Sequence, residues 1–86
     1  MFFEQLISAR KKTVGAKQTL KALKTMEREG IKTIFIAKDA DPHIVEPILR
    51  LCSTKGVPVA EVDSMQMLGK ACSIEVGCAA AAVIEQ

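Results

Sequence analysis

Apolar residues near the start of the chain recur at the spacing of a helix. Phe3, Leu6 and Ile7 lie three and four positions apart, which predicts one helical face. The basic residues 10–12 are expected to close this helix, because cations complement the negative end of the helix dipole. On local sequence alone, Thr13-Val14-Gly15 then indicates a break.

A second helix is predicted over residues 17–29. Leu20, Leu23 and Met26 form its apolar stripe, and Gly30 is the expected C-terminal stop. The compact run 33–37 that follows is apolar and β-branched, so we expect a buried strand.

The middle of the chain carries clear helix start and stop signals. Residues 38–42 form a polar loop in which Asp41 fits an N-cap and Pro42 a first helical position. A third helix is therefore predicted from Pro42 to about residue 54, ending at Lys55-Gly56. The side chains that we expect this helix to bury are Ile44, Val45, Ile48, Leu49 and Cys52.

The last third of the chain predicts further alternation of strand and helix. Residues 57–62 indicate a strand in which Pro58 favours an unpaired or edge position. Asp63-Ser64 can cap a short helix over 65–71, and 72–77 form a loop. The alanine-rich segment 78–84 is ambiguous, because alanine favours helix whereas a last strand would complete a sheet. This alternation predicts an α/β fold with a sheet between helical layers.

Length and composition limit the classes of protein. A chain of 86 residues predicts one domain, over residues 1–86, and 49% hydrophobic residues argue against disorder. No apolar stretch approaches the roughly 20 residues of a membrane span. The start of the sequence lacks the basic region and cleavage site of a signal peptide, so we expect a cytoplasmic protein with no membrane partner.

The sequence gives little support for metal binding or catalysis. Cys52, Cys72 and Cys78 are odd in number, form no Cys-x-x-Cys motif and lie far from His43 along the chain. We therefore expect buried, reduced core residues, and none of the three has a neighbour that predicts a reactive, low-pKa thiol. Asp39 and Asp41 are explained by turn formation and helix capping. No catalytic residue, metal or cofactor is expected.

Positive charge is concentrated at the N-terminal end. Residues 1–24 hold six basic side chains against Glu4 alone, a net charge of +5, whereas the remaining 62 residues carry −3. Lys17 and Lys21 share one face of the second helix, with Gln18 beside it. The positive end of the helix dipole favours acidic residues at the start of a helix. Lysines at this position therefore indicate a polyanionic ligand, a nucleic acid whose base edges these side chains could contact. The alternative is that they form an ordinary solvent-exposed helix face.

Three segments together resemble a known family. They are Gly15–Lys21 (GAKQTLK), Ala37–Pro42 (AKDADP) and Leu68–Gly77 (LGKACSIEVG). In order and spacing they resemble the kink-turn-binding ribosomal proteins, whose archaeal type member is L-seven-Ae and which include a eukaryotic L-thirty-e protein. The small bacterial members from Firmicutes are the most similar. The resemblance implies a three-layer α/β/α sandwich with a four-stranded mixed sheet, in which 13–15 and the final segment are strands.

The resemblance also implies a function. The family binds kink-turn RNA, a helix bent at a bulge beside sheared G·A pairs. Lys17, Gln18 and Lys21 would face guanine edges, and Gly15 would allow close approach of the backbone. The other residues that the resemblance assigns to the RNA are Lys12 or Thr13 at phosphates, Ala16 in the same motif, and Lys70 with Ile74, Glu75 and Val76 at the bulge.

These expectations describe a monomeric, non-catalytic protein associated with the ribosome. Its partner would be a structured RNA that contains a kink-turn, either ribosomal RNA or a riboswitch-like RNA. The alternatives are a ribosome-assembly or protein-interaction module with weak RNA binding, and a small thiol-dependent enzyme. A single-strand binder is disfavoured, because aromatic residues make up only 3% of the chain and Phe35 is expected to be buried.

Overall fold

The four strands form one mixed sheet. The computed structural model describes residues 11–26, 30–72 and 77–85. The strands are β1 (Lys11–Val14), β2 (Thr33–Ala37), β3 (Val59–Val62) and β4 (Ala80–Glu85), in the order β1-β4-β2-β3. Strand β4 runs antiparallel to both β1 and β2, whereas β2 and β3 are parallel. The mixed four-stranded sheet is therefore confirmed, and the ambiguous final segment is a strand.

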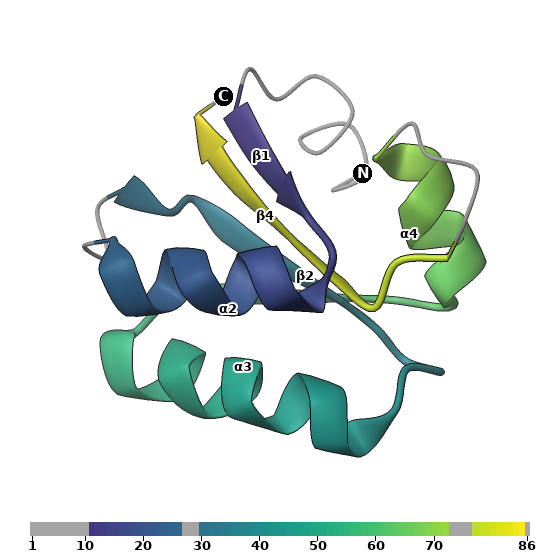
Figure 1. The fold of residues 1–86 in the computed structure, drawn as a ribbon, viewed down its shortest axis with the longest axis horizontal. Helices are drawn as coiled ribbons and strands as arrows, with labels where there is room; N and C mark the ends of the chain where they lie inside the picture. The colour runs from purple at the N-terminus through teal and green to yellow at the C-terminus, as the bar shows by residue number, and fades with distance from the viewer. Residues whose placement is uncertain (1–10, 27–29, 73–76, 86) are drawn as a thin grey trace.

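Helices cover both faces of this sheet. They are α2 (Ala16–Thr25), α3 (Pro42–Lys55) and α4 (Met65–Ala71). Helices α2 and α3 lie side by side on one face, and α4 lies on the other (Figure 1). This arrangement confirms the α/β/α layers. The helix predicted from Phe3, Leu6 and Ile7 lies outside the described residues.

The core is built around two inner strands. Phe35 on β2 and the alanines 80–82 on β4 are 0% exposed. Small side chains on β4 let the helices approach the sheet closely, which explains why an alanine run occupies a central strand despite its helical propensity. Ile34, Leu23, Ile48 and Leu68 complete the core from β2 and the three helices.

The basic run before Gly15 was predicted wrongly. Lys11 and Lys12 do not close a helix but lie in β1, where Lys12 is paired with Val83 of β4. Pairing with a distant strand decides the conformation here. The strand that the family resemblance implied at 13–15 is present and begins two residues earlier.

Helix α2 is shorter than the sequence predicts. It ends at Thr25 rather than near residue 29, and Met26 is already extended at φ −103° and ψ 149°. The ammonium group of Lys55, from the end of α3, donates hydrogen bonds to the carbonyl oxygens of Leu23 and Met26. A side chain from α3 thus donates to carbonyl oxygens that would otherwise need amides of a further helical turn, or water, as hydrogen-bond donors.

Helix α3 follows its sequence signals closely at both ends. Asp41 accepts a hydrogen bond from the His43 amide at 2.9 Å, and Pro42 is the first helical residue. Gly56 ends the helix at φ 71°, a left-handed conformation that suits glycine.

The predicted buried face of α3 was too wide. Val45, Ile48 and Cys52 are buried, but Ile44 and Leu49 are 47% and 41% exposed. The buried residues follow one narrow stripe at i, i+3 and i+7, and Ile44 and Leu49 flank it.

The edge strand and the short helix are close to their predictions. Strand β3 lies at an edge of the sheet and begins directly after Pro58, two residues later than expected. Ser64 caps α4 by accepting a hydrogen bond from the Met67 amide. Asp39, in the loop after β2, also contacts the start of α4: its carboxylate accepts a hydrogen bond from the Met65 amide at 2.7 Å.

Replacing Lys55 with methionine should destabilise the protein through the end of α2. Met keeps much of the apolar stem but leaves two carbonyls without their charged donor, so we expect a loss of about 1–3 kcal/mol in the free energy of unfolding, measured in urea. Lys38→Met is the matched control, since the Lys38 side chain forms an exposed ion pair with Asp63 at 3.9 Å and no other bond to the described residues. Equal stability of the two variants would contradict the role of Lys55.

Candidate nucleic-acid interface

The candidate interface begins at a glycine turn between β1 and α2. Gly15 has φ 96° and ψ 152°, a conformation essentially restricted to glycine. Its amide donates to the Ala80 carbonyl at 2.9 Å, and its own carbonyl accepts the Thr19 amide at 3.1 Å. The second of these is the first hydrogen bond of α2. The turn therefore joins the sheet directly to the start of the helix.

The N-terminus of α2 has no side-chain cap among the residues that the structure describes. Within those residues no side chain accepts a hydrogen bond from the first amides, and the first turn contains no acidic residue. Helices usually satisfy these amides with Ser, Thr, Asp or Asn. The free amides and the positive end of the dipole are instead combined with the exposed side chains of Lys17 and Gln18. This combination suits an anionic ligand.

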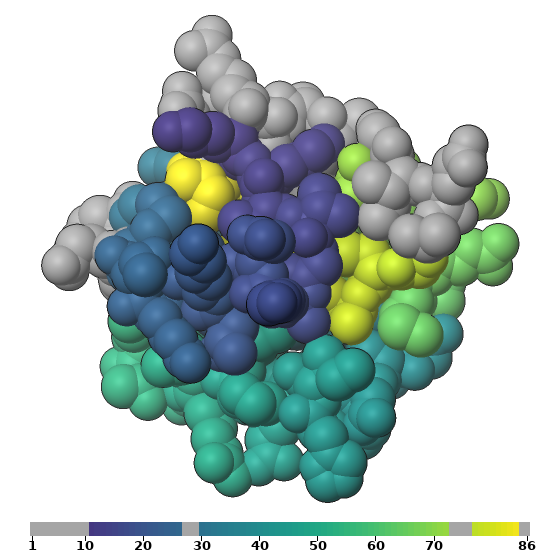
Figure 2. All heavy atoms as spheres, viewed as in Figure 1, coloured from purple at the N-terminus to yellow at the C-terminus, as the bar shows by residue number. Residues whose placement is uncertain are grey.

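The polar face of α2 continues beyond its first turn. Four polar side chains of α2 are exposed: Lys17, Gln18, Lys21 and Lys24. Lys17 and Lys21 lie four residues apart and therefore on the same side of the helix. Figure 2 shows α2 and β1 next to each other on the same surface of the protein. Lys12, on β1, is half-buried.

A pair of threonines holds the start of α2 against the sheet. The hydroxyls of Thr13 and Thr19 are 2.9 Å apart and share a hydrogen bond. Thr13 Oγ1 also accepts the Ala82 amide at 3.1 Å, and Thr19 is completely buried. Sequence reasoning missed Thr19, although a polar residue on the helix face that also carries Leu23 was a usable signal. Thr13, predicted at a phosphate, points its hydroxyl into this network.

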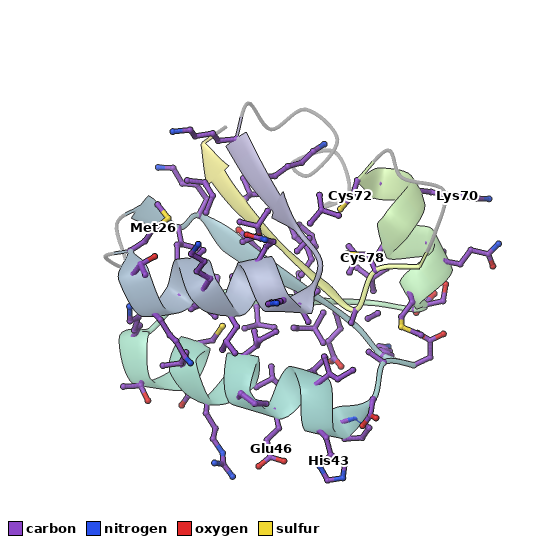
Figure 3. The ribbon with its side chains drawn as sticks, in the orientation of Figure 1. Met26, His43, Glu46, Lys70, Cys72 and Cys78 are labelled. Atoms are coloured by element: carbon purple, nitrogen blue, oxygen red, sulfur yellow. The ribbon has the colours of Figure 1, made fainter. Side chains whose placement is uncertain are left out.

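The structure brings together some of the predicted site residues. One end of α2 holds Gly15, Lys17, Gln18 and Lys21. Ala16 lies at the same end, but it is half-buried and packs against the core. Lys70 is exposed on α4 and points outward from that helix (Figure 3). The remaining predicted residues, Ile74, Glu75 and Val76, lie outside the described residues.

A cysteine pair behind the glycine turn departs from the sequence expectation. Cys72 and Cys78 are buried free thiols, as predicted. The hydrogen bond from Cys72, together with the amides of Gly15 and Ala80, lowers the pKa of Cys78 to about 7 despite its burial. The expectation of no low-pKa cysteine was therefore wrong for Cys78. Of the groups involved, only Gly15 is distant in sequence.

The described residues offer little to a metal ion or a bilayer. Within residues 11–26, 30–72 and 77–85, no group of three His, Cys, Asp or Glu side chains could hold a metal. Over the same ranges, no helix has the length and apolar character needed to cross a membrane.

Two bacterial proteins are similar over almost the whole chain. A protein of Bacillus pumilus (strain SAFR-032) named "RNA-binding protein" is 46% identical over 84 residues, which cover 98% of this chain and 99% of that protein. "RNA-binding protein YbxF" of Geobacillus stearothermophilus is 45% identical over 85 residues, with the same coverage.

Solved structures agree with these sequence relationships. The "Giardia lamblia 15.5kD RNA binding protein" is similar with a TM-score of 0.81 and 30% identity, over 99% of this chain and 69% of that one. A Bacillus halodurans C protein of unknown function, at 24% identity and a TM-score of 0.77, shares the fold over 96% of this chain and 84% of its own. Residues 4–86 match the profile of the ribosomal protein L7Ae/L30e/S12e/Gadd45 family, and the chain belongs to that family.

Proposed function

We propose that this chain is a non-catalytic RNA-binding protein of the cytoplasm that recognises and stabilises kink-turn RNA. The observation that carries the proposal is the uncapped N-terminus of α2, where exposed Lys17, Gln18 and Lys21 follow the Gly15 turn. Membership of the family and the names of the relatives, each called an RNA-binding protein, support it. Residues 1–86 would act as a single domain and as a monomer.

The dimensions of RNA explain why a kinked target suits this helix end. The major groove of regular A-form RNA is too narrow and deep for side chains to read. A kink with sheared G·A pairs opens that groove, so the start of α2 would reach the guanine edges. Guanine offers its O6 and N7 as acceptors, which suit Lys17 and Lys21. The Gln18 amide can both donate and accept.

Residues around the glycine turn would bind the RNA backbone. Gly15 has no side chain to obstruct it, and the free amides of the first turn can donate to a phosphate oxygen. Lys12, on β1, would contact a phosphate, and Thr13 would act chiefly by holding the turn in place. Lys70 and the residues Ile74, Glu75 and Val76 would contact the bulged nucleotide.

Binding of the bent form would shift the RNA population toward the kink. The protein does not need to cleave or form any bond, since its effect comes from a difference in affinity for two RNA conformations. A kink-turn in ribosomal RNA or in a riboswitch-like RNA would be its target, and the first of these would associate the protein with the ribosome.

Gln18→Ala and Lys12→Gln should weaken RNA binding in different ways. Gln18 is neutral, so its loss should lower affinity about tenfold without changing the salt dependence. Lys12→Gln should instead make the slope of log affinity against log salt shallower by roughly 0.7–0.9, because one phosphate contact is lost. Both effects are measured by titration of a standard kink-turn RNA at several salt concentrations.

Arg50→Gln is the control for these two variants. Arg50 is exposed on α3, where it forms an ion pair with Glu46 of the same helix. It should change neither the affinity at a fixed salt concentration nor the slope by more than experimental error. If all three variants behaved alike, binding would depend on overall positive charge, and the assigned roles of Gln18 and Lys12 would be wrong.

Thr13→Val should reduce both stability and RNA affinity. The substitution keeps the shape of the side chain but leaves the buried Ala82 amide without its acceptor and Thr19 without its partner. We expect a loss of about 1–3 kcal/mol in unfolding free energy, together with weaker RNA binding at an unchanged salt slope. Thr25→Val is the control, because the exposed Thr25 hydroxyl donates to the carbonyl of Lys21 in its own helix and to nothing else in the described part of the chain. Full RNA affinity in folded Thr13→Val would rule out the positioning role.

A further inference from the structure

Two aspartates of one loop cap two different helices. Asp41 accepts the His43 amide at 2.9 Å and so begins α3, which follows it directly. Asp39 instead accepts the Met65 amide at 2.7 Å, and Met65 is the first residue of α4, 26 residues further along the chain. The segment Ala37–Pro42, which holds both aspartates, is one of the three that carry the family resemblance. The contacts with RNA proposed for this chain use neither of them.

The loop that carries Asp39 is itself attached to the neighbouring strand. The amide of Lys38, the preceding residue, donates to the carbonyl of Val62, the last residue of β3, at 2.8 Å. Ser64 accepts the Met67 amide at 3.1 Å and so satisfies a second amide at the start of α4. A carboxylate also suits this end of α4, because the dipole of a helix is positive there. Asp39 therefore holds the start of α4 against the loop after β2.

Met65 also contacts the residues that lead into β4. Its carbonyl oxygen accepts the Cys78 amide at 3.0 Å. Gly77 lies so close to it that a Cβ added there would be 3.2 Å from the Met65 Cβ, a distance at which one of the two would have to shift. Figure 3 shows Cys78 in the region between α4 and the sheet. The start of α4 and the segment before β4 are therefore expected to move together.

The segment before β4 also contacts the glycine turn of the candidate interface. The carbonyl oxygen of Ala80, the first residue of β4, accepts the Gly15 amide at 2.9 Å. The same oxygen accepts a hydrogen bond from the Cys78 thiol, also at 2.9 Å. A path of hydrogen bonds and short backbone segments therefore connects Asp39 to Gly15. It joins α4 to the turn from which α2 begins.

We propose that Asp39 is a positioning residue of the RNA interface, which sets α4 relative to the start of α2. This inference rests on the proposed function, in which Lys17 and Gln18 of α2 face the G·A pairs and the exposed Lys70 of α4 contacts the bulged nucleotide. Asp39 does not need to touch the RNA itself. It fixes the separation of two groups of contacts that the RNA engages at the same time, and a misplacement of about 1 Å is enough to weaken such contacts.

Asp39→Ala tests this role, with Asp41→Ala as the matched control. Both variants remove one carboxylate from the same loop and one cap from a helix, so the urea midpoint of unfolding should fall by a similar amount in each. Both also raise the net charge by one, so the non-specific attraction to RNA changes equally. In titrations of a kink-turn RNA, we expect Asp39→Ala to bind about fivefold more weakly than Asp41→Ala.

Lys70→Gln shows whether the loss of affinity arises at α4. If Asp39 acts by placing Lys70, the two substitutions remove the same contact, and their effects on affinity should not add. We therefore expect Asp39→Ala to cost clearly less affinity in the Lys70→Gln protein than in the wild-type protein. Asp39→Asn is the conservative variant, because its amide oxygen can still accept the Met65 amide, and its affinity should stay within about twofold of the wild-type value.

Hydrogen exchange tests the connection between the two elements in the absence of RNA. Relative to the wild-type protein, Asp39→Ala should speed exchange at the amides of Met65 and Cys78, because the start of α4 opens more often. Asp41→Ala should instead speed exchange at the start of α3 and leave Cys78 unchanged. This measurement depends only on the fold.

The positioning role and kink-turn recognition fail in different ways. If the wild-type protein prefers the kink-turn but Asp39→Ala and Asp41→Ala bind it equally, recognition stands and the positioning role is overturned. That role is also overturned if Asp39→Asn loses as much affinity as Asp39→Ala, or if exchange at Cys78 does not change. If the wild-type protein does not prefer the kink-turn at all, the proposed function is wrong, and with it the interface that Asp39 would position.

Discussion

The hydroxyl of Thr13 connects three elements whose relative positions decide where α2 begins. It accepts the Ala82 amide of the central strand β4 and shares a hydrogen bond with Thr19, which is buried in the first turns of α2. The intervening Gly15 adopts a conformation that other residues rarely take. The start of the helix is therefore fixed to the sheet from behind, and its free amides and polar side chains remain available on the outer side.

Features that depend on neighbouring residues could be predicted from the sequence. The strand 33–37 is a short β-branched apolar run, and its observed bounds are those expected. Asp41 with Pro42 begins α3, and Ser64 begins α4, because a capping side chain bonds amides only two or three residues away. The family resemblance added the final strand, which the alanine run left undecided.

Features set by distant contacts could not be predicted in the same way. The end of α2 depends on Lys55, 29 residues beyond Met26, and β1 forms because β4 pairs with it. The hydrogen bond from the Cys78 amide to the Met65 carbonyl of α4 likewise exists only in the folded chain. Within the candidate site, the exposed positions of Lys17 and Gln18 at the start of a helix could be predicted from the sequence. The buried position of Thr19, which supports that helix start, was not predicted.

The central claim is that this helix start reads the non-standard geometry of a kink-turn and not merely its negative charge. The most direct measurement is a binding titration against a kink-turn RNA, beside the same RNA with its sheared G·A pairs replaced by Watson–Crick pairs. Total charge is equal in the two, so the account predicts a preference of about tenfold or more for the intact kink-turn. Equal affinity for both RNAs would contradict it.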